Sequence, residues 1–123
     1  MSNIKPTEAE LEILQILWEK GPSTVRTVNE LLNTRRDVGY TTTLKLMQIM
    51  FEKGLATRME EGRTHVYTAA LDEQDTQRRL LQQFVDTAFR GNASRLMLQL
   101  LGDHQADAAE LEAIKALIEQ MEK

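Results

Sequence analysis

The chain has 123 residues, of which 41% are hydrophobic and 28% charged, and it contains no cysteine. Its length suits one domain or a small domain with an extension, and its aliphatic content and balanced charge exclude an intrinsically disordered chain. The absence of cysteine excludes disulfide bonds, thiolate metal sites and thiol nucleophiles.

We expect a soluble, cytoplasmic protein without membrane insertion. The first ten residues lack the basic and apolar regions of a signal peptide, and no apolar run approaches the length that crosses a bilayer. The net charge of −4 arises in residues 71–123, which carry six Lys or Arg and ten Asp or Glu, whereas residues 1–70 carry nine of each kind. Residues 20–70 hold eight basic side chains against five acidic ones. Because a local basic surface matters more for phosphate contact than the total charge, this distribution permits a nucleic-acid partner.

The first part of the chain begins with two predicted helices. Residues 7–10 (TEAE) form a capping box, apolar residues then recur at helical spacing, and Gly21-Pro22 ends the first helix. Ser23 or Thr24 caps a second helix, which runs to about residue 34.

The third helix lies within residues 38–53, VGYTTTLKLMQIMFEK. Thr41 can cap it, and Thr43, Met47 and Met50 recur at i, i+4 and i+7 as its inner face. The segments 55–59 and 64–69 are short and rich in Thr, Val and Tyr, and a turn of four residues, EEGR, lies between them. The sequence therefore predicts a β-hairpin after the third helix.

Residues 71–123 contain three helical segments that each carry an apolar stripe. About fifty residues rarely build a sufficient core alone, so the stripes predict a symmetric contact with a second copy of the chain. The residues expected at this dimer contact are Leu81, Phe84, Val85, Phe89, Leu111, Ile114, Leu117 and Ile118.

The order of the elements predicts a fold that is mainly α with a small β-hairpin. Three helices followed by a hairpin in residues 1–70 match a winged helix-turn-helix DNA-binding domain, and residues 71–123 then form a helical dimerisation region. A homodimer of this kind would place two reading helices on a near-palindromic DNA site.

Three consecutive threonines near the start of the third helix favour contact with DNA, because helix capping explains one of them and not all three. Near a duplex, hydroxyls and free first-turn amides bind phosphates, threonine methyls touch thymine methyls, and Lys45 can reach phosphate or guanine. Leu46 and Ile49 lie beside the inner face of this helix. Three explanations stay open for them, of which we favour the first: a wider buried stripe, contact with thymine methyls, or reduced affinity for DNA.

Four segments occur in a specific order: residues 7–18 (TEAELEILQILW), 39–44 (GYTTTL), 52–55 (EKGL) and 62–67 (GRTHVY). In this order and spacing they resemble the penicillinase repressor family (BlaI/MecI), whose copper-responsive relatives are called CopY. The resemblance covers nearly the whole chain and is densest in residues 7–70. It implies a winged-helix repressor that forms a dimer through its C-terminal helices.

The resemblance also implies site residues. It places Thr41, Thr42 and Lys45 in the family's DNA-contacting stretch. For Arg58 and Arg63 it implies a wing that touches phosphates or the minor groove, although an ordinary solvated hairpin is equally open. The residues expected to contact DNA are Thr41, Thr42, Thr43, Lys45, Gln48, Arg58 and Arg63.

The sequence shows no catalytic motif, so we expect no enzyme activity, no metal site and no cofactor. Without a cysteine cluster, copper sensing of the CopY kind is excluded. In the β-lactam branch of the family, a membrane sensor-protease pathway leads to cleavage in the C-terminal region. By resemblance the cleaved bond corresponds to Gln99–Leu100, which differs from the Asn–Phe pair of well-known members.

Together these features predict a DNA-binding transcriptional repressor that acts as a homodimer on a near-palindromic operator. The alternative is a winged-helix protein–protein interaction module without DNA binding, which the acidic total charge and the apolar residues Leu46 and Ile49 motivate.

Overall fold

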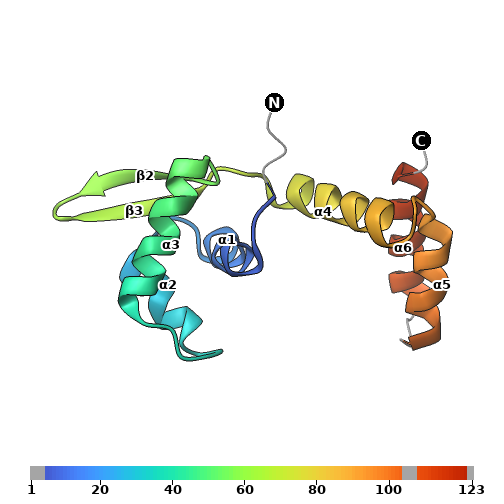
Figure 1. Ribbon diagram of the computed structural model, residues 1–123, viewed down its shortest axis with the longest axis horizontal. Coiled ribbons are helices and arrows are strands. Elements are labelled where there is room, and N and C mark those ends of the chain that lie inside the picture. Colours follow the sequence, from blue (N-terminus) through green and yellow to red (C-terminus); the bar gives the residue numbers. More distant parts are fainter. Residues whose placement is uncertain (1–4, 104–107, 122–123) are drawn as a thin grey trace. The chain divides into compact units, whose positions relative to one another are not determined.

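The computed structural model describes residues 5–103 and 108–121, and its internal contacts divide the chain into two units, Met1–Thr76 and Gln77–Lys123 (Figure 1). The elements are α1 Glu8–Lys20, β1 Ser23–Thr24, α2 Val25–Leu32, α3 Tyr40–Lys53, β2 Ala56–Glu61, β3 Thr64–Ala69, α4 Glu73–Ala88, α5 Ala93–Asp103 and α6 Ala108–Met121. The described chain is mainly helical with a small antiparallel sheet, which confirms the predicted fold class.

The first unit extends past residue 70 because Trp18 holds the chain there. The indole Nε1 of Trp18 donates a hydrogen bond of 2.9 Å to the Leu71 carbonyl oxygen, and Leu71 packs against the core. The sequence suggests a boundary after residue 70, whereas the contacts continue to Thr76. The DNA-binding and dimerisation roles of the two regions stay predictions.

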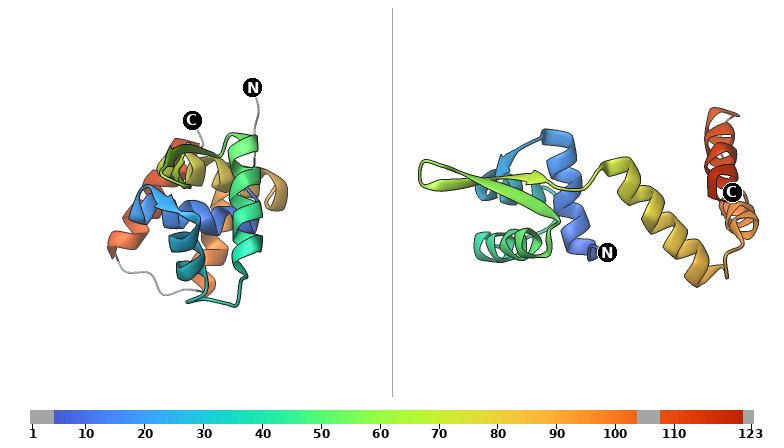
Figure 2. Two further views of the ribbon diagram at one scale, coloured as in Figure 1. Left: turned by 90° about the vertical axis from the view of Figure 1, so that its left-hand side faces the viewer. Right: turned by 90° about the horizontal axis from the view of Figure 1, so that it is seen from above.

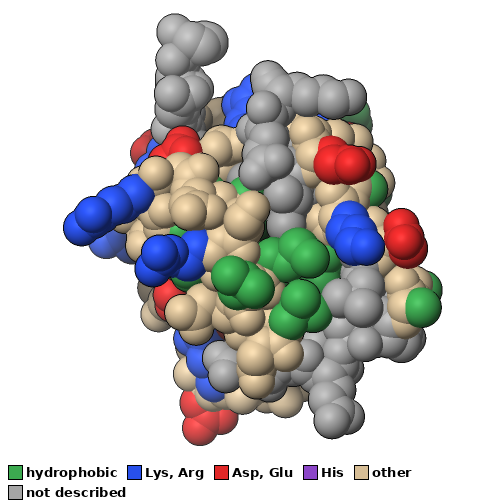
Figure 3. Space-filling view, turned by 90° about the vertical axis from the view of Figure 1, so that its right-hand side faces the viewer, with side chains coloured by type: hydrophobic (Ala, Val, Ile, Leu, Met, Phe, Trp, Pro, Cys, Tyr) green, Lys and Arg blue, Asp and Glu red, His purple; other side chains and the backbone are tan. Residues whose placement is uncertain are grey.

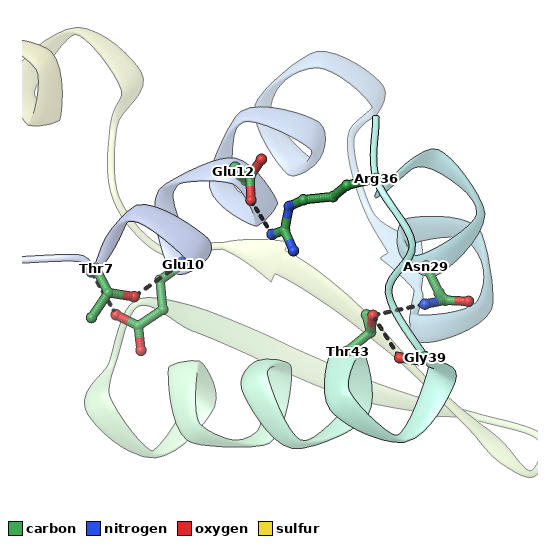
Figure 4. Close-up of polar contacts among 7 residues, drawn as sticks. All are labelled: Thr7, Glu10, Glu12, Asn29, Arg36, Gly39 and Thr43. Carbon is green, nitrogen blue, oxygen red and sulfur yellow. Dashed lines mark hydrogen bonds and ion pairs between the residues drawn. The ribbon is translucent and has the colours of Figure 1, made fainter. Parts of the chain in front are cut away.

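The predicted capping box begins α1 (Figure 4). Thr7 Oγ1 accepts a hydrogen bond from the Glu10 amide at 3.2 Å, and Glu10 Oε1 accepts one from the Thr7 amide at 2.9 Å. The buried Glu10 carboxylate also accepts hydrogen bonds from Lys53 Nζ, at 2.8 and 3.0 Å. Because Lys53 is the last residue of α3, this ion pair fastens the end of α3 to the start of α1.

The core of the first unit lies between α1, α2, α3 and the base of the sheet (Figure 2). Each helix contributes apolar residues from one face, because about 3.6 residues per turn bring positions i, i+4 and i+7 to the same side. Burying one aliphatic side chain fully contributes about 1.5–3 kcal/mol. The buried hydrophobic residues are Ile13, Leu14, Ile16, Leu17, Val25, Val28, Leu32, Val38, Met47, Met50, Leu55, Ala56 and Tyr67.

A two-residue strand that the sequence does not indicate joins the hairpin. β1 pairs antiparallel with β3, with Ser23 opposite Tyr67, so the strand order is β1-β3-β2. Thr24 belongs to β1 and also caps α2, since its Oγ1 accepts a hydrogen bond from the Thr27 amide at 3.2 Å. β1 therefore ties the start of α2 to the hairpin.

The hairpin has a tighter turn than predicted. Glu60 and Glu61 continue β2, and the pairing extends to Glu61 opposite Thr64. Only Gly62 and Arg63 remain in the turn, and Gly62 takes a φ of 65°, a conformation that glycine adopts without a steric penalty. The prediction of a four-residue turn was thus wrong, because Glu60 and Glu61 belong to β2. Arg63 lies at the tip of the hairpin.

Two asparagines hold the corner between α2 and α3. Asn29 Nδ2 donates hydrogen bonds to the Val38 carbonyl oxygen at 2.9 Å and to Thr43 Oγ1 at 2.8 Å (Figure 4). Asn33 Nδ2 donates to the same Val38 carbonyl at 2.8 Å, and Asn33 Oδ1 accepts from the Val38 amide at 3.2 Å. The Thr43 hydroxyl in turn donates to the Gly39 carbonyl oxygen at 3.4 Å. These bonds fix the start of α3 relative to α2.

The second unit buries few hydrophobic side chains by itself. Among its described residues, only Val85 and Ala93 are buried hydrophobics. α5 and α6 pack against each other, while large apolar side chains such as Phe84 and Leu98 remain exposed. Across the part of the chain that the structure describes, no helix is long and apolar enough to span a membrane.

Replacing Thr43 with valine should lower the free energy of unfolding by about 1–3 kcal/mol, because Asn29 then loses a buried hydrogen-bond partner. Valine keeps the shape and the β-branch of threonine, so the change isolates the hydroxyl. Thr42→Val is the matched control: Thr42 is exposed and should shift the free energy by less than about 0.5 kcal/mol. Urea denaturation followed by circular dichroism measures both variants, and equal effects would contradict the role of the Asn29–Thr43 bond.

Glu10→Gln should destabilise the protein at neutral pH and flatten its loss of stability in acid. Burial raises the pKa of Glu10, but hydrogen bonds from Lys53 and Thr7 outweigh it, so the pKa lies below the usual glutamate value. A carboxyl group with a lowered folded-state pKa stabilises the fold above its unfolded pKa, and this contribution disappears as pH falls through the folded pKa. Because the Lys53 side chain is 37% exposed, we expect a difference of only about 1 kcal/mol.

Urea denaturation of the wild type and Glu10→Gln between about pH 7 and pH 3 tests this linkage. Glu8→Gln is the control, because Glu8 lies in the same first turn but is exposed. A gap between wild type and Glu10→Gln that stays constant down to the lowest pH would refute the assignment.

Candidate nucleic-acid interface

α3 has one buried and one exposed face. Thr43, Met47 and Met50 are at most 1% exposed. Since successive residues turn by about 100° around a helix, the stripe of Thr41, Lys45 and Gln48 lies on the opposite side, and all three residues are exposed. We call this stripe the outer face of α3.

The start of α3 leaves hydrogen-bonding groups available. Its N-cap is Gly39, with no side-chain cap, so the prediction that Thr41 caps the helix was wrong. Thr41 and Thr42 instead lie in the first turn, and within the described residues neither hydroxyl has a hydrogen-bond partner. First-turn amides without a cap and free hydroxyls together are suited to an anion such as a phosphate.

Thr43 is buried, unlike the exposed Thr41 and Thr42. It is 0% exposed, and its hydroxyl is shared between Asn29 and Gly39 inside the fold (Figure 4). The burial of this side chain speaks against the expected DNA contact by Thr43, which stays a prediction, and favours a role in positioning α3. The partner that decides this, Asn29, lies fourteen residues earlier in the chain, and helical spacing alone does not reveal it.

The apolar residues on the two flanks of α3 differ in how far they are buried. Leu46 packs against the core, which supports the wider buried stripe for this residue, and Ile49 is half-buried. On the other flank, Tyr40 is 51% exposed and Phe51 38% exposed. Phe51 lies under the guanidinium group of Arg58, whose Cζ is 4.0 Å from the centre of the ring.

The two arginines of the hairpin have different surroundings. Arg63 is exposed at the turn, and within the described residues it has no hydrogen bond or ion pair. Arg58 Nη1, in contrast, lies 3.5 Å from the buried Tyr67 hydroxyl, while its guanidinium group covers Phe51. Tyr67 is 1% exposed and therefore packs inside the fold.

A groove of about 490 Å³ lies between the first turn of α2, the first turn of α3 and the hairpin. Arg26 and Arg63 bring positive charge to it, and Tyr40 and His65 bring polar aromatic rings. The prediction from sequence did not include Arg26 or Tyr40; a basic residue directly after the α2 cap is the signal that could have indicated Arg26. The groove is lined by Thr24, Val25, Arg26, Tyr40, Leu44, Arg63, Thr64, His65 and Tyr67.

Ion pairs remove some basic residues from this surface. Arg36 forms an ion pair with Glu12, and the hydrogen bond and charge of Glu12 raise the pKa of Arg36 further (Figure 4). Lys53 is similarly paired with Glu10. In the described part of the first unit, Arg26, Lys45 and Arg63 have no such partner, and each lies on α3 or the groove.

The residues predicted for dimerisation are partly placed by the structure. Phe84 is 52% exposed and meets the ring of Phe89 edge-on at 5.6 Å, and Leu81, Phe89 and Ile114 are half-buried. Val85 is 1% exposed within the single chain, which speaks against its expected contact with a partner, and that contact stays a prediction. The side chains of Leu111, Leu117 and Ile118 lie outside the described residues.

Further apolar side chains lie on α5. Leu98 is 70% exposed, and Leu100 and Leu101 are also exposed, although the sequence-based set did not include them. Figure 3 looks onto the side that carries α5 and α6 and shows hydrophobic side chains gathered there. Gln99 and Leu100, the expected cleavage site, are both exposed and lie inside the helix α5.

Comparison with known proteins places the chain among repressors. Residues 6–120 match the model of the penicillinase repressor family. A transcriptional regulator BlaI from Mycobacterium tuberculosis is 32% identical over 116 residues, covering 86% of this chain and 84% of that protein. A penicillinase repressor from Bacillus licheniformis is 25% identical over 115 residues, covering 93% and 89%.

Solved structures resemble part of the chain. The solution structure of the DNA-binding domain of the repressor BlaI matches with a TM-score of 0.51 and 26% identity, covering 58% of this chain and 93% of that domain. The Bacillus licheniformis BlaI monomeric form in complex with the blaP half-operator matches with a TM-score of 0.52 and 26% identity, covering 60% and 90%. The sheet with its three preceding helices is thus a winged-helix fold, and the chain belongs to the penicillinase repressor family.

Proposed function

We propose that this protein is a DNA-binding transcriptional repressor that acts as a homodimer on a near-palindromic operator. The observation that carries the proposal is the outer face of α3, where polar side chains that have no partner among the described residues lie opposite a fully buried stripe. The relatives named as transcriptional regulators, and a BlaI in complex with a half-operator, support the same function.

In this proposal the outer face of α3 enters the major groove. The Thr41 and Thr42 hydroxyls and the uncapped first-turn amides bind phosphates, and the threonine methyls can touch thymine methyls. Lys45 reaches a phosphate or the acceptor edge of guanine, and the Gln48 amide is suited to adenine. Thr43 holds this face in place from inside.

The groove beside α3 extends the interface along the DNA backbone. Arg26 at the start of α2 and Arg63 at the hairpin tip both line it, so two positive charges lie on one concave surface. Phosphate contacts of this kind fix the register of the protein on the duplex and add affinity that depends on salt.

The second unit supports a homodimer. Its described residues bury only two hydrophobic side chains, while Phe84, Leu98, Leu100 and Leu101 stay exposed. A helical unit of this size rarely has a sufficient core of its own. A second copy with the same apolar stripes covers these side chains in both chains at once.

Release from DNA follows, in this proposal, from cleavage at Gln99–Leu100 through a membrane sensor-protease pathway. Both residues are exposed, which gives a protease access to the segment. Since α5 is helical there, this segment must unwind before it can enter a protease site as an extended chain. Cleavage would then divide the proposed dimer contact.

The alternative, a protein–protein module without DNA binding, loses part of its support. Leu46 was one of its grounds, and this side chain is partly buried and packs against the core. A gel-shift with the DNA upstream of the protein's own gene separates the two functions. No sequence-preferring complex at low salt would refute the repressor.

Lys45→Ala should weaken DNA binding on all sequences and reduce the slope of log K against log salt by about one, because one phosphate contact is lost. Lys20→Ala is the control, since Lys20 is exposed at the end of α1 and belongs neither to the outer face of α3 nor to the proposed dimer contact. Fluorescence anisotropy over a salt series measures both slopes. An unchanged slope for Lys45→Ala would reject a phosphate contact by this residue.

Phe84→Glu should convert the dimer to a monomer at micromolar concentration, because a charge would be buried at the centre of the proposed contact. Thr87→Glu is the matched control, as it adds the same charge at another exposed position of α4. Light scattering after size exclusion gives the mass of each variant. A wild-type protein that is already monomeric would contradict the homodimer.

A further inference from the structure

We propose that Arg58 is a positioning residue, which holds the hairpin against α3 through Phe51 and does not bind DNA phosphates itself. This inference rests on the proposed DNA-binding function. It assigns a different role to one of the two hairpin arginines that the sequence places together at the interface.

The contacts of Arg58 join three elements. Arg58 lies on β2, and its guanidinium carbon is 4.0 Å from the centre of the Phe51 ring on α3. Its Nη1 donates a hydrogen bond of 3.5 Å to the hydroxyl of Tyr67, which is its direct partner in the pairing of β2 with β3. A cation over an aromatic face is attracted by the ring quadrupole, and arginine also stacks on it with its plane.

The partners of Arg58 are well anchored. Tyr67 is 1% exposed and pairs with Ser23 of β1, so the Tyr67 end of the contact belongs to the rigid part of the sheet. Phe51 follows the buried Met50 on α3 and is 38% exposed. The Phe51 ring therefore lies at the surface of the domain, where its flat face is covered by the guanidinium group of Arg58.

The connection between α3 and β2 explains why such a contact is needed. Only Gly54 and Leu55 separate α3 from β2, and Gly54 takes a φ of 84° as the C-cap of the helix. The base of the hairpin is fixed, because Leu55 and Ala56 are buried and the Leu55 amide donates a hydrogen bond of 2.9 Å to the Met50 carbonyl oxygen. The residues of β2 after Ala56 are exposed, and the Arg58–Phe51 contact holds this exposed part of the hairpin against α3.

A fixed angle between α3 and the hairpin matters for DNA. In the proposed complex, α3 reads the major groove while Arg63 at the hairpin tip contacts the backbone, so both contacts form together only at one spacing. A hairpin that is held in place before binding loses less conformational freedom on binding. Arg58 thus strengthens DNA binding through Phe51, whereas Arg63 acts directly.

The test compares Arg58→Met and Phe51→Leu with Arg63→Met, a matched change of the other hairpin arginine. Anisotropy with the labelled duplex from immediately upstream of the gene gives log K against log salt for each protein. Arg58→Met and Phe51→Leu should each reduce the binding constant by about three- to tenfold at every salt concentration. The slope of log K against log salt should stay the same, since no phosphate contact is lost. Arg63→Met should reduce the slope by about one.

The double variant Arg58→Met/Phe51→Leu should bind about as tightly as either single variant, because both changes remove the same contact. A slope for Arg58→Met that falls by about one would overturn the proposal in favour of a phosphate contact. A binding constant of Arg58→Met that equals the wild-type value at every salt concentration would also overturn the proposal, since Arg58 would then serve stability alone. Additive losses in the double variant would show that Phe51 is not the partner.

A second measurement separates this inference from the DNA-binding function. Urea denaturation without DNA of the wild type, Arg58→Met, Phe51→Leu and the double variant gives the coupling energy between Arg58 and Phe51, and a coupling of zero refutes the contact independently of DNA binding. If the coupling is present but the wild type binds no DNA, the proposed function fails, and the positioning role fails with it.

Discussion

The buried hydrogen bond from Asn29 to Thr43 holds the first turn of α3 with its inner side toward α2. Thr43 is buried in the first turn of α3, and its hydroxyl is held at 2.8 Å by an amide on α2. Because the helix is rigid, fixing the rotation of the first turn also fixes Met47 and Met50 in the core and Lys45 and Gln48 on the outside. The last turn is fixed independently, through the ion pair of Lys53 with Glu10. α3 is therefore held at both ends by polar contacts, and along its length by apolar packing.

The distribution of charge follows the same division between scaffold and interface. Glu10 and Glu12 neutralise Lys53 and Arg36, which tie the elements of the scaffold together. Within the described residues, Arg26, Lys45 and Arg63 have no ion pair, and they lie on the outer face of α3 or along the groove beside it. An acidic chain can in this way present a local positive field, because the potential near a surface depends on its nearest charges.

The sequence predicts the regular parts of this structure well. The capping box at Thr7 and Glu10, the inner face of α3 and the hairpin all rest on local spacing, and local spacing is readable. β1 was missed because a two-residue strand has no alternation, and it exists only through its pairing with β3. The fold class was thus predictable, whereas the third strand of the sheet required the tertiary structure.

The candidate site was less predictable, for a related reason. The roles of Thr43 and Arg58 depend on Asn29 and Phe51, and no local pattern links the members of either pair. Threonine and arginine are residue types that bind phosphate. Residue type therefore predicts a DNA contact for Thr43 as readily as for Thr41, and for Arg58 as readily as for Arg63. Only the burial of the hydroxyl and the ring beneath the guanidinium group distinguish them. The sequence identifies such residues as candidates, but only their tertiary contacts show whether the side chain is available to a ligand.

The small number of basic residues at the proposed interface of one copy explains why the C-terminal helices matter for function. Arg26, Lys45 and Arg63 offer about three phosphate contacts, and a few such contacts give weak, salt-sensitive binding. In the proposed dimer, the second copy binds next to the first at a high effective concentration, so the two weak contacts combine into a tight one. Separation of the two copies would therefore reduce affinity far more than the loss of any single contact on α3, which makes the dimer contact the effective point at which to control repression.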